Sequence, residues 1–292
     1  MKTTFVLFLI FPVLGSCQFS KSAKKDLLSG LSSTGSNISC EDVYISVNNE
    51  RTTRNSFIYG ETFYLNFSDV TGFTKENGNV FPGMNMIVVD DLGDTLMHTD
   101  DLITNYPDGM NFSPLLLTAD LTIADPLKSD GKYTVIINIR DRKGKGTYRS
   151  KYDFTVKKSD RIAIESSKVA FDEIYIYSQG NDKVIIDNKI KFNDNVYIII
   201  EGLKGFAESN GMVFPGLNIK ATDAAGNVVL DSDDLFTEYS VSGIATSDFA
   251  ERVSAHFSVP GTQFNNPLHC ELTVYDKKSD AKIKAVTDLF VE

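Results

Sequence analysis

The sequence predicts an all-β protein built from two tandem antiparallel β-sandwich domains. The chain matches itself when it is shifted by 133 residues. Short segments alternate apolar and polar residues, as half-buried strands do. After residue 16 no segment shows a long apolar helical stripe. Several short strands in every ~120 residues, separated by turn signals, are typical of a sandwich.

The internal repeat is clearest between residues 72–106 and 205–239, where 16 of 35 aligned positions are identical. Two copies are too few for a solenoid, whose units depend on their neighbours, so each copy should be a domain with its own core. We place the first domain at residues 40–157 and the second at residues 168–292, with a linker at residues 158–167.

The strands are predicted from period-2 patterns bounded by turn residues. Polar turns rich in glycine and aspartate, such as residues 90–93 and 223–226, separate them. The clearest runs are Val43–Val47, Phe63–Phe67, Tyr133–Arg140, Asn195–Ile200, Leu217–Thr222 and Leu272–Tyr275.

The first 16 residues are predicted to be a secretory signal peptide. A short start containing Lys2 precedes ten apolar residues, 5–14, and small residues follow. Ten apolar residues are too few to span a bilayer, which takes ~20 in a helix.

The segment Leu14-Gly15-Ser16-Cys17 resembles the lipobox of bacterial lipoproteins. The resemblance implies that Cys17 carries several acyl chains, which anchor a protein more stably than one chain does. An ordinary signal peptide with an incidental cysteine is the alternative. Gln18 in place of an aspartate implies an outer-membrane location in the bacterial cell envelope, with the periplasmic or surface face left open. Residues 17–39 are rich in Ser, Lys and Gly, so we expect the lipidated Cys17 to be followed by a flexible tether.

Residues 130–135 resemble the start of strand F in immunoglobulin-like (Ig-like) domains. The resemblance implies a tyrosine corner, in which the Tyr133 hydroxyl returns to the backbone. The second copy has Leu268 and Cys270 at the positions of Tyr133 and Val135, so its corner should be lost or replaced. The chain is thus similar to bacterial outer-membrane-type lipoproteins with tandem Ig-like β-sandwiches, a likeness that implies no specific activity.

Two cysteines lie within the repeats. Cys40 and Cys270 could form a disulfide in an oxidising compartment. They fall in different domains, and each aligns with an apolar position of the other copy. We therefore expect two buried core thiols.

A duplicated motif supplies most of the candidate site residues. Asn-Gly and the following glycines are expected to supply positive φ, proline a bend, and phenylalanine a plug for the end of the core. A duplicated ligand loop would look the same, but the match continues into the next strand, which favours a structural role. The motif residues are Asn77, Gly78, Phe81, Pro82 and Gly83 in the first copy, and Asn210, Gly211, Phe214, Pro215 and Gly216 in the second.

Two aspartate pairs also recur, Asp100-Asp101 and Asp233-Asp234. Clustered oxygen ligands could hold Ca²⁺, which takes six to eight of them. The spacing matches no EF-hand loop, and aspartates beside turns commonly cap backbone N–H groups. We therefore expect turn and cap chemistry and no metal site.

Composition and motifs argue against several function classes. The net charge is −10, and removal of residues 1–16 with Lys2 leaves −11, so nucleic acid is not an expected partner. The three histidines lie in no nucleophile motif, and fingerprints of serine hydrolases, zinc proteases and nucleotide-binding folds are absent. No cofactor and no catalytic residue are predicted.

The sequence therefore predicts a non-enzymatic, membrane-anchored envelope lipoprotein that acts as a protein-interaction, adhesion or accessory module. The alternative is a glycan-binding lipoprotein, similar to surface proteins of polysaccharide-uptake systems that combine Ig-like and carbohydrate-binding domains. The lack of Trp disfavours sugar binding, which uses aromatic faces, but 12 Tyr leave it open.

The anchor can be tested directly. Changing Cys17→Ser should remove acylation and release the mature chain into the soluble fraction. Fractionation with labelled palmitate measures this. A variant that stays in the membrane pellet, with an unlabelled wild type, contradicts the lipobox prediction.

Overall fold

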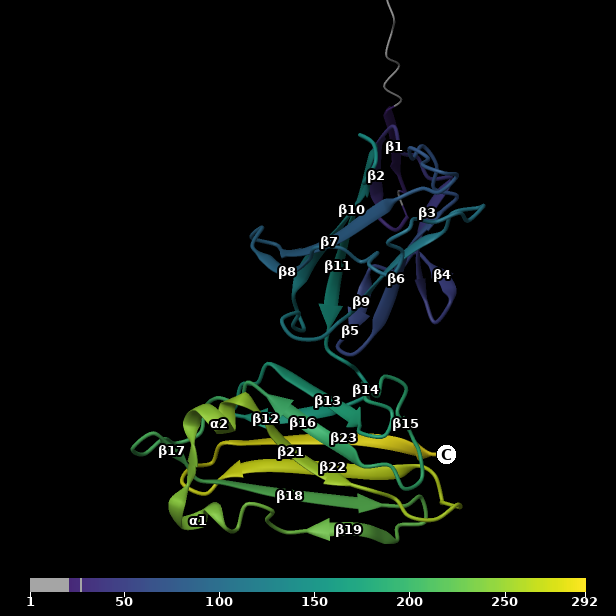
Figure 1. The fold of residues 1–292 in the computed structure, drawn as a ribbon. Coiled ribbons are helices and arrows are strands. Elements are labelled where there is room, and N and C mark those ends of the chain that lie inside the picture. The colour runs from purple at the N-terminus through teal and green to yellow at the C-terminus, as the bar shows by residue number, and fades with distance from the viewer. Residues whose placement is uncertain (1–20, 27) are drawn as a thin grey trace, which may run out of the picture.

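The computed structural model describes residues 21–26 and 28–292. Figure 1 shows two β-rich units, the end of the first resting on the second. Residues 1–16, Cys17 and the start of the expected tether lie outside the described residues. Neither of the two helices found in the described part is long and apolar enough to cross a membrane.

The first unit is a sandwich of two antiparallel-dominated sheets. One has the order β1-β2-β11-β10-β7-β8, with β5 added in parallel to β11, and the other has the order β4-β3-β6-β9. The strands are β1 (Lys21–Lys25), β2 (Ser32–Ser36), β3 (Asp42–Val47), β4 (Glu50–Thr52), β5 (Ser56–Ile58), β6 (Thr62–Ser68), β7 (Pro82–Asp90), β8 (Thr95–Thr99), β9 (Leu117–Thr122), β10 (Lys132–Asp141) and β11 (Thr147–Lys157).

The second unit repeats this arrangement. Its sheets have the orders β12-β23-β22-β18-β19, with β15 parallel to β23, and β14-β13-β16-β21. A short β17-β20 ladder and two helices are added before β21. The elements are β12 (Ala163–Ser167), β13 (Glu173–Ser178), β14 (Lys183–Val184), β15 (Lys189–Ile190), β16 (Val196–Glu201), β17 (Met212–Val213), β18 (Pro215–Thr222), β19 (Val228–Ser232), α1 (Tyr239–Ser242), β20 (Ile244–Ala245), α2 (Thr246–Glu251), β21 (Val253–Phe257), β22 (Leu268–Asp276) and β23 (Lys282–Val291).

Both units are Ig-like sandwiches, which confirms the predicted fold class. The central strands β3-β6-β9 face β11-β10-β7 in the first, and β13-β16-β21 face β23-β22-β18 in the second. Each predicted strand coincides with an observed one, and the alternation has the expected direction. On β10, for example, Val135, Ile137 and Ile139 are buried. The two cores are separate clusters of buried residues.

The tyrosine corner is present in the first domain. The Tyr133 hydroxyl accepts a hydrogen bond from the Lys128 N–H (2.8 Å) and donates one to the Lys128 carbonyl (3.0 Å). In the second domain the aligned Leu268 and Cys270 are fully buried instead. An apolar side chain fills the corner there, as the sequence comparison suggested.

Cys40 and Cys270 are free thiols buried in separate cores, which confirms the prediction for both. Burial raises the pKa of each thiol to about 12. Neither is therefore a reactive thiolate at neutral pH.

The expected tether differs from the structure over its described part. Residues 32–36 form β2, which pairs with β11, and β1 pairs with β2 in turn. The inward positions of β2 are Ser33 and Gly35, and the Ser33 hydroxyl accepts a hydrogen bond from the buried Tyr148 hydroxyl (2.7 Å). The large side chain at this contact, Tyr148, belongs to β11, whereas β2 contributes only small residues. The sequence of β2 alone therefore resembles a linker.

The structure also shortens the expected linker at residues 158–167, of which residues 158–162 connect β11 to β12. Residues 163–167 form β12, which pairs with β23 as β2 pairs with β11. The chain then turns through Asn37 or Lys168, which both have positive φ. A Cβ on Gly72 would lie 1.8 Å from the Asn37 carbonyl oxygen, and one on Gly205 2.1 Å from that of Lys168. This first strand therefore belongs to the repeat, and each domain begins earlier than the sequence indicated.

The boundary correction has a measurable consequence. Residues 28–160 and 161–292 should each fold cooperatively, whereas residues 40–160 should be less stable than residues 28–160 by at least about 2 kcal/mol. Leu31 and Ile38 are buried, and burial of one such side chain contributes ~1.5–3 kcal/mol. Urea unfolding measures the difference.

The control is Leu28→Ala in residues 28–160, because Leu28 is exposed. That substitution should leave the midpoint unchanged. Equal stabilities of the long and short fragments would show that β2 is a dispensable edge.

Candidate functional site

The duplicated Asn-Gly pairs form hairpin tips. Asn77 and Gly78 have φ of 52° and 83°, and Asn210 and Gly211 have 53° and 75°. Backbone hydrogen bonds between Glu76 and Asn79 close the first tip. Two successive positive φ values are what this tight turn requires, and Asn-Gly tolerates them best. The expected positive φ is present at these four residues.

Phe81 and Phe214 do not plug the cores. Each is half-buried, and a lysine ammonium from the β10-β11 or β22-β23 turn lies over its ring, Lys143 at 4.8 Å and Lys278 at 4.9 Å from the centroid. Phe73 and Phe206 pack against the two cores instead. The duplicated phenylalanines thus fasten two loops together at the domain end through a cation–π contact.

Pro82-Gly83 and Pro215-Gly216 begin β7 and β18, and proline is tolerated at the first residue of a strand. Neither glycine has the positive φ that the sequence suggested. A Cβ on Gly83 would lie 2.9 Å from Arg140 Nε, and one on Gly216 2.1 Å from the Tyr275 ring. These glycines make room for a large side chain on the neighbouring strand.

Asp101 and Asp234 close the same corner in the two copies. Asp101 Oδ1 accepts hydrogen bonds from the N–H groups of Met84 (3.1 Å) and Ile103 (3.0 Å). Its Oδ2 accepts from Arg140 and Arg142, both at 2.8 Å. Burial opposes ionisation, but these backbone and arginine donors hold the pKa of Asp101 below its ordinary value.

In the second copy Asp234 Oδ1 accepts from the N–H groups of Leu217 (3.2 Å) and Phe236 (2.9 Å). Its Oδ2 lies 2.7 Å from Lys277 Nζ. Burial again opposes ionisation, and Lys277 with the two backbone donors lowers the pKa of Asp234. The carboxylate role is conserved between the copies while the cation that balances it changes.

The other member of each pair, Asp100 or Asp233, is exposed. Asp100 lies 3.5 Å from His98 Nδ1. Across the described ranges no three His, Cys, Asp or Glu side chains converge in a way that could hold a metal ion. The geometry of Asp101 and Asp234 is that of backbone caps.

Sequence reasoning missed a second duplicated carboxylate. Asp141 is buried at the end of β10 and accepts hydrogen bonds from the N–H groups of Thr74 (2.7 Å) and Lys143 (3.0 Å). Asp276 does the same for Ala207 (2.7 Å) and Lys278 (2.9 Å). The available signal was an aspartate at the end of an apolar strand in both copies.

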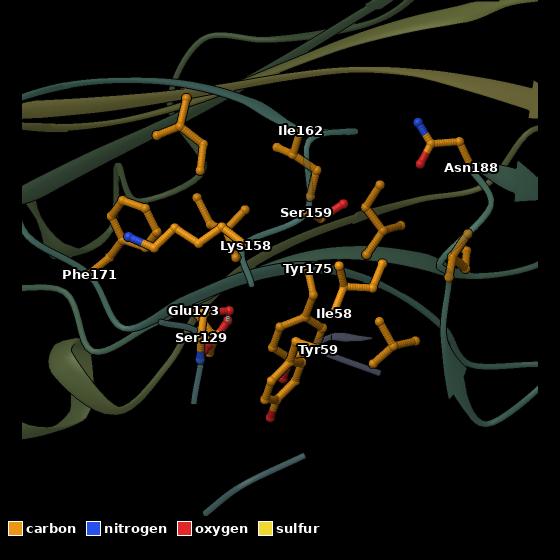
Figure 2. Close-up of a pocket in the computed structure, with 15 residues that line it drawn as sticks. Ile58, Tyr59, Ser129, Lys158, Ser159, Ile162, Phe171, Glu173, Tyr175 and Asn188 are labelled. Carbon is orange, nitrogen blue, oxygen red and sulfur yellow. Dashed lines mark hydrogen bonds between the residues drawn. The ribbon is translucent and has the colours of Figure 1, made fainter. Parts of the chain in front are cut away.

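The two domains meet in an interface, the interdomain seam, that the sequence did not predict. The Tyr59 and Tyr175 rings lie against one another with centroids 5.0 Å apart (Figure 2). A Cβ on Gly60, whose φ is +87°, would lie 2.3 Å from Val184 Cβ across the seam. Glycine is required here both for the turn and for the close approach.

A buried carboxylate also crosses the seam. Glu173, at the start of β13, accepts hydrogen bonds from the Ser129 N–H and from the Ser129 hydroxyl, the latter at 2.9 Å (Figure 2). Burial raises the pKa of Glu173, and the Ser129 donors and Lys128 reduce that rise only in part. Glu201 beside it accepts a hydrogen bond from the Tyr175 hydroxyl (2.7 Å) and lies 3.2 Å from Arg252.

Two hollows of different character border the seam. The cavity drawn in Figure 2, between Phe171, Glu173, Tyr175 and Ile58, has a volume of about 20 Å³, room for about one water molecule. An open cleft of about 690 Å³ lies between the β3-β4 turn of the first domain and the β13-β14 turn of the second. Only the cleft falls in the size range of ligand sites.

No family model matches the chain, and no curated protein sequence matches it. Among solved structures it is similar to three N-terminal domains of the outer capsid protein Hoc of bacteriophage RB49. That match has 11% identity, covers 85% of this chain and 58% of the other, and has a TM-score of 0.21. The chain therefore spans less than two thirds of that structure.

Two further solved structures match with similarly low sequence identity and TM-score. The C-terminal domain of the Streptococcus agalactiae AgI/II polypeptide BspA has 10% identity, coverage of 84% and 99%, and a TM-score of 0.24. A DUF3823 family protein from Bacteroides ovatus has 10% identity, coverage of 75% and 93%, and a TM-score of 0.22. Matches with TM-scores this low support no inference about activity.

The aspartate caps give a matched pair of substitutions. Asp101→Ala should destabilise the first domain by about 2–3 kcal/mol, because it removes hydrogen bonds to a charged acceptor and leaves two arginines without their partner. Asp100→Ala, whose side chain is 96% exposed, should change stability by no more than about 0.5 kcal/mol. Urea unfolding measures both.

Calcium separates a cap from a metal site in the same variants. We expect the same melting temperature in millimolar Ca²⁺ as in chelator. If the native state did bind Ca²⁺, a hundredfold excess over Kd would raise the free energy of unfolding by about 2.7 kcal/mol. A calcium-dependent rise that Asp101→Ala or Asp234→Ala abolishes would make these corners metal sites.

The seam predicts a pH dependence through Glu173. Its folded pKa is raised, so the folded state binds the proton more tightly than the unfolded state. Protonated Glu173 therefore stabilises the folded state. This contribution is complete below the pKa that Glu173 has in the unfolded chain, and it is lost as the pH rises through its pKa in the folded protein. The unfolding free energy of the wild type should therefore fall across this window just above the ordinary carboxyl pKa.

Glu173→Gln keeps the shape and removes the titration, so its profile should be flatter than that of the wild type. Urea unfolding from pH 4 to 7.5 measures both profiles. Superimposable profiles would mean that Glu173 is not desolvated by domain docking.

Proposed function

We propose that this chain is a non-enzymatic, lipid-anchored lipoprotein of the bacterial cell envelope that serves as a protein-interaction, adhesion or accessory module. The observation that carries the proposal is the order of the chain: a segment that resembles a lipobox and ends at Cys17, then two Ig-like sandwiches. Several acyl chains on Cys17 would hold the chain at the outer membrane. The membrane face on which it stands is left open.

The use of the duplicated polar residues supports a module without chemistry of its own. Each of these carboxylates accepts a hydrogen bond from a distant backbone N–H group, in strands β7 and β18 for Asp101 and Asp234 and in loops for Asp141 and Asp276. Carboxylates occupied in this way hold loops and are poorly placed to exchange protons with a substrate. They fit a scaffold that presents its surfaces to a partner.

Glycan binding is the second candidate, and one specific observation favours it. The interdomain cleft is lined by two tyrosines, Tyr64 and Tyr177, together with asparagine, aspartate and lysine side chains. Rings combined with planar amides and carboxylates match the apolar faces and hydroxyl groups of sugars. Such a lipoprotein would hold a polysaccharide at the cell envelope.

The test is purification of the tagged mature lipoprotein from detergent-solubilised native membranes, followed by glycan-array probing of the same sample. One envelope protein in stoichiometric amount supports the interaction module, and a glycan signal supports the second candidate. Turnover of an envelope polymer that survives purification to homogeneity contradicts both.

A further inference from the structure

We infer that the interdomain cleft is a binding site for a neutral oligosaccharide segment. This inference rests on the second candidate function and assigns its site. The cleft is built by both domains, so neither copy of the repeat contains it alone. Its volume of about 690 Å³ lies within the range of small-molecule sites.

One tyrosine comes from each wall of the cleft. Tyr64 lies on β6 at an outward position, between the buried Phe63 and Leu65. Tyr177 lies on β13, where its hydroxyl donates a hydrogen bond to Asp182 and its ring is inclined at 61° to that of Tyr197, with centroids 6.4 Å apart. These two contacts fix the position of the Tyr177 ring at the cleft wall. Fixed rings bind with little loss of side-chain entropy.

Equivalent hairpin turns supply the polar groups on the rim. Asn48 and Asn49 form the β3-β4 turn, both at positive φ, and Asn181 with Asp182 forms the β13-β14 turn. Amide side chains offer a donor and an acceptor side by side. Adjacent hydroxyl groups of a sugar present the complementary pair. The rim thus suits a polyhydroxylated ligand.

The charges of the lining favour a neutral ligand over an anionic polymer. Lys189 is paired with Glu292 at 3.0 Å, and Glu61 is paired with Arg54. Lys183 and Lys191 are balanced by Asp182 and Asp187 in the same lining. A chain of net charge −10 adds long-range repulsion for a polyanion.

A peptide ligand fits the cleft less well. Peptide recognition uses apolar pockets for anchor side chains or an extended free sheet edge. Edge strands reach the cleft with few residues: β14 with Lys183 and Val184, β15 with Lys189, and β9 with its last residue, Thr122. The lining combines Val184, Ile185 and Ile186 with a larger number of polar side chains around the two tyrosines, a mixture that matches a sugar better.

The test uses the full mature lipoprotein in detergent and a panel of neutral glucan, mannan and xylan oligosaccharides, read by calorimetry. We expect the wild type to bind at least one of them. Tyr64→Ala and Tyr177→Ala should each weaken that binding about tenfold, which corresponds to one lost ring contact. Tyr64→Phe should retain binding, because the ring remains.

Two further variants guard against misfolding and indirect effects. Thr122→Trp places a bulky ring at an exposed cleft position and should abolish binding without lowering the melting temperature. Tyr44→Ala is the matched control: Tyr44 is on the same sheet face, beneath Arg51 at 4.8 Å, and does not line the cleft. It should bind as the wild type does.

The outcomes separate the site from the function. Wild-type binding that Tyr64→Ala, Tyr177→Ala and Thr122→Trp leave intact overturns the cleft while glycan binding stands. Failure of the wild type to bind any neutral oligosaccharide overturns the inference, and a blank glycan array from the same sample overturns glycan binding as well. Binding only to pectin fragments, or only to a random peptide library, overturns the assignment of ligand class.

Discussion

Each sandwich buries one side of every central strand, and this constraint decides where polar groups can stand. A carboxylate that enters the end of the core must be hydrogen-bonded, because an unsatisfied buried charge is costly. Asp141 and Asp276 meet this condition by binding the backbone of a loop that is distant in sequence. Asp101 and Asp234 do so at the neighbouring corner. The duplicated loops are therefore shared by the two copies because their hydrogen bonds to these carboxylates hold the ends of each sandwich together.

The two copies differ on the outer face of the sheet that contains β3 or β13. In the first domain Arg51 lies over Tyr44 and pairs with Asp42 at 2.6 Å. In the second domain the equivalent strands carry Val184, Tyr175 and Glu173, and these three residues receive the first domain. Tyr44 is thus covered by Arg51 of its own domain, whereas Tyr175 is covered by Tyr59 of the first domain. This difference gives the tandem a polarity.

Most of the fold could be predicted from the sequence, since much of β10 and β18 alternates between buried and more exposed positions and both copies repeat the pattern. The first strand of each domain could not, because Ser33 and Gly35 fill a space shaped by Tyr148 on β11. Within the duplicated motif, the expected positive φ is present at the Asn-Gly pairs, whereas Gly83 and Gly216 lack it and instead leave space for a large side chain on the neighbouring strand. The seam and its cleft arise from packing between copies, which a repeat alignment does not reveal.

The position of β1 bears on how the chain carries tension. Lys21 pairs with Ser36 and Ser36 with Thr147, so the chain enters the sheet at the start of β11, while it leaves for the second domain at the end of β11. A pull between the segment before Lys21 and the second domain therefore acts along the strands. Hydrogen bonds loaded in shear must break together, whereas a peeled edge loses them one at a time. The β1-β2-β11 ladder is thus oriented as a mechanical clamp.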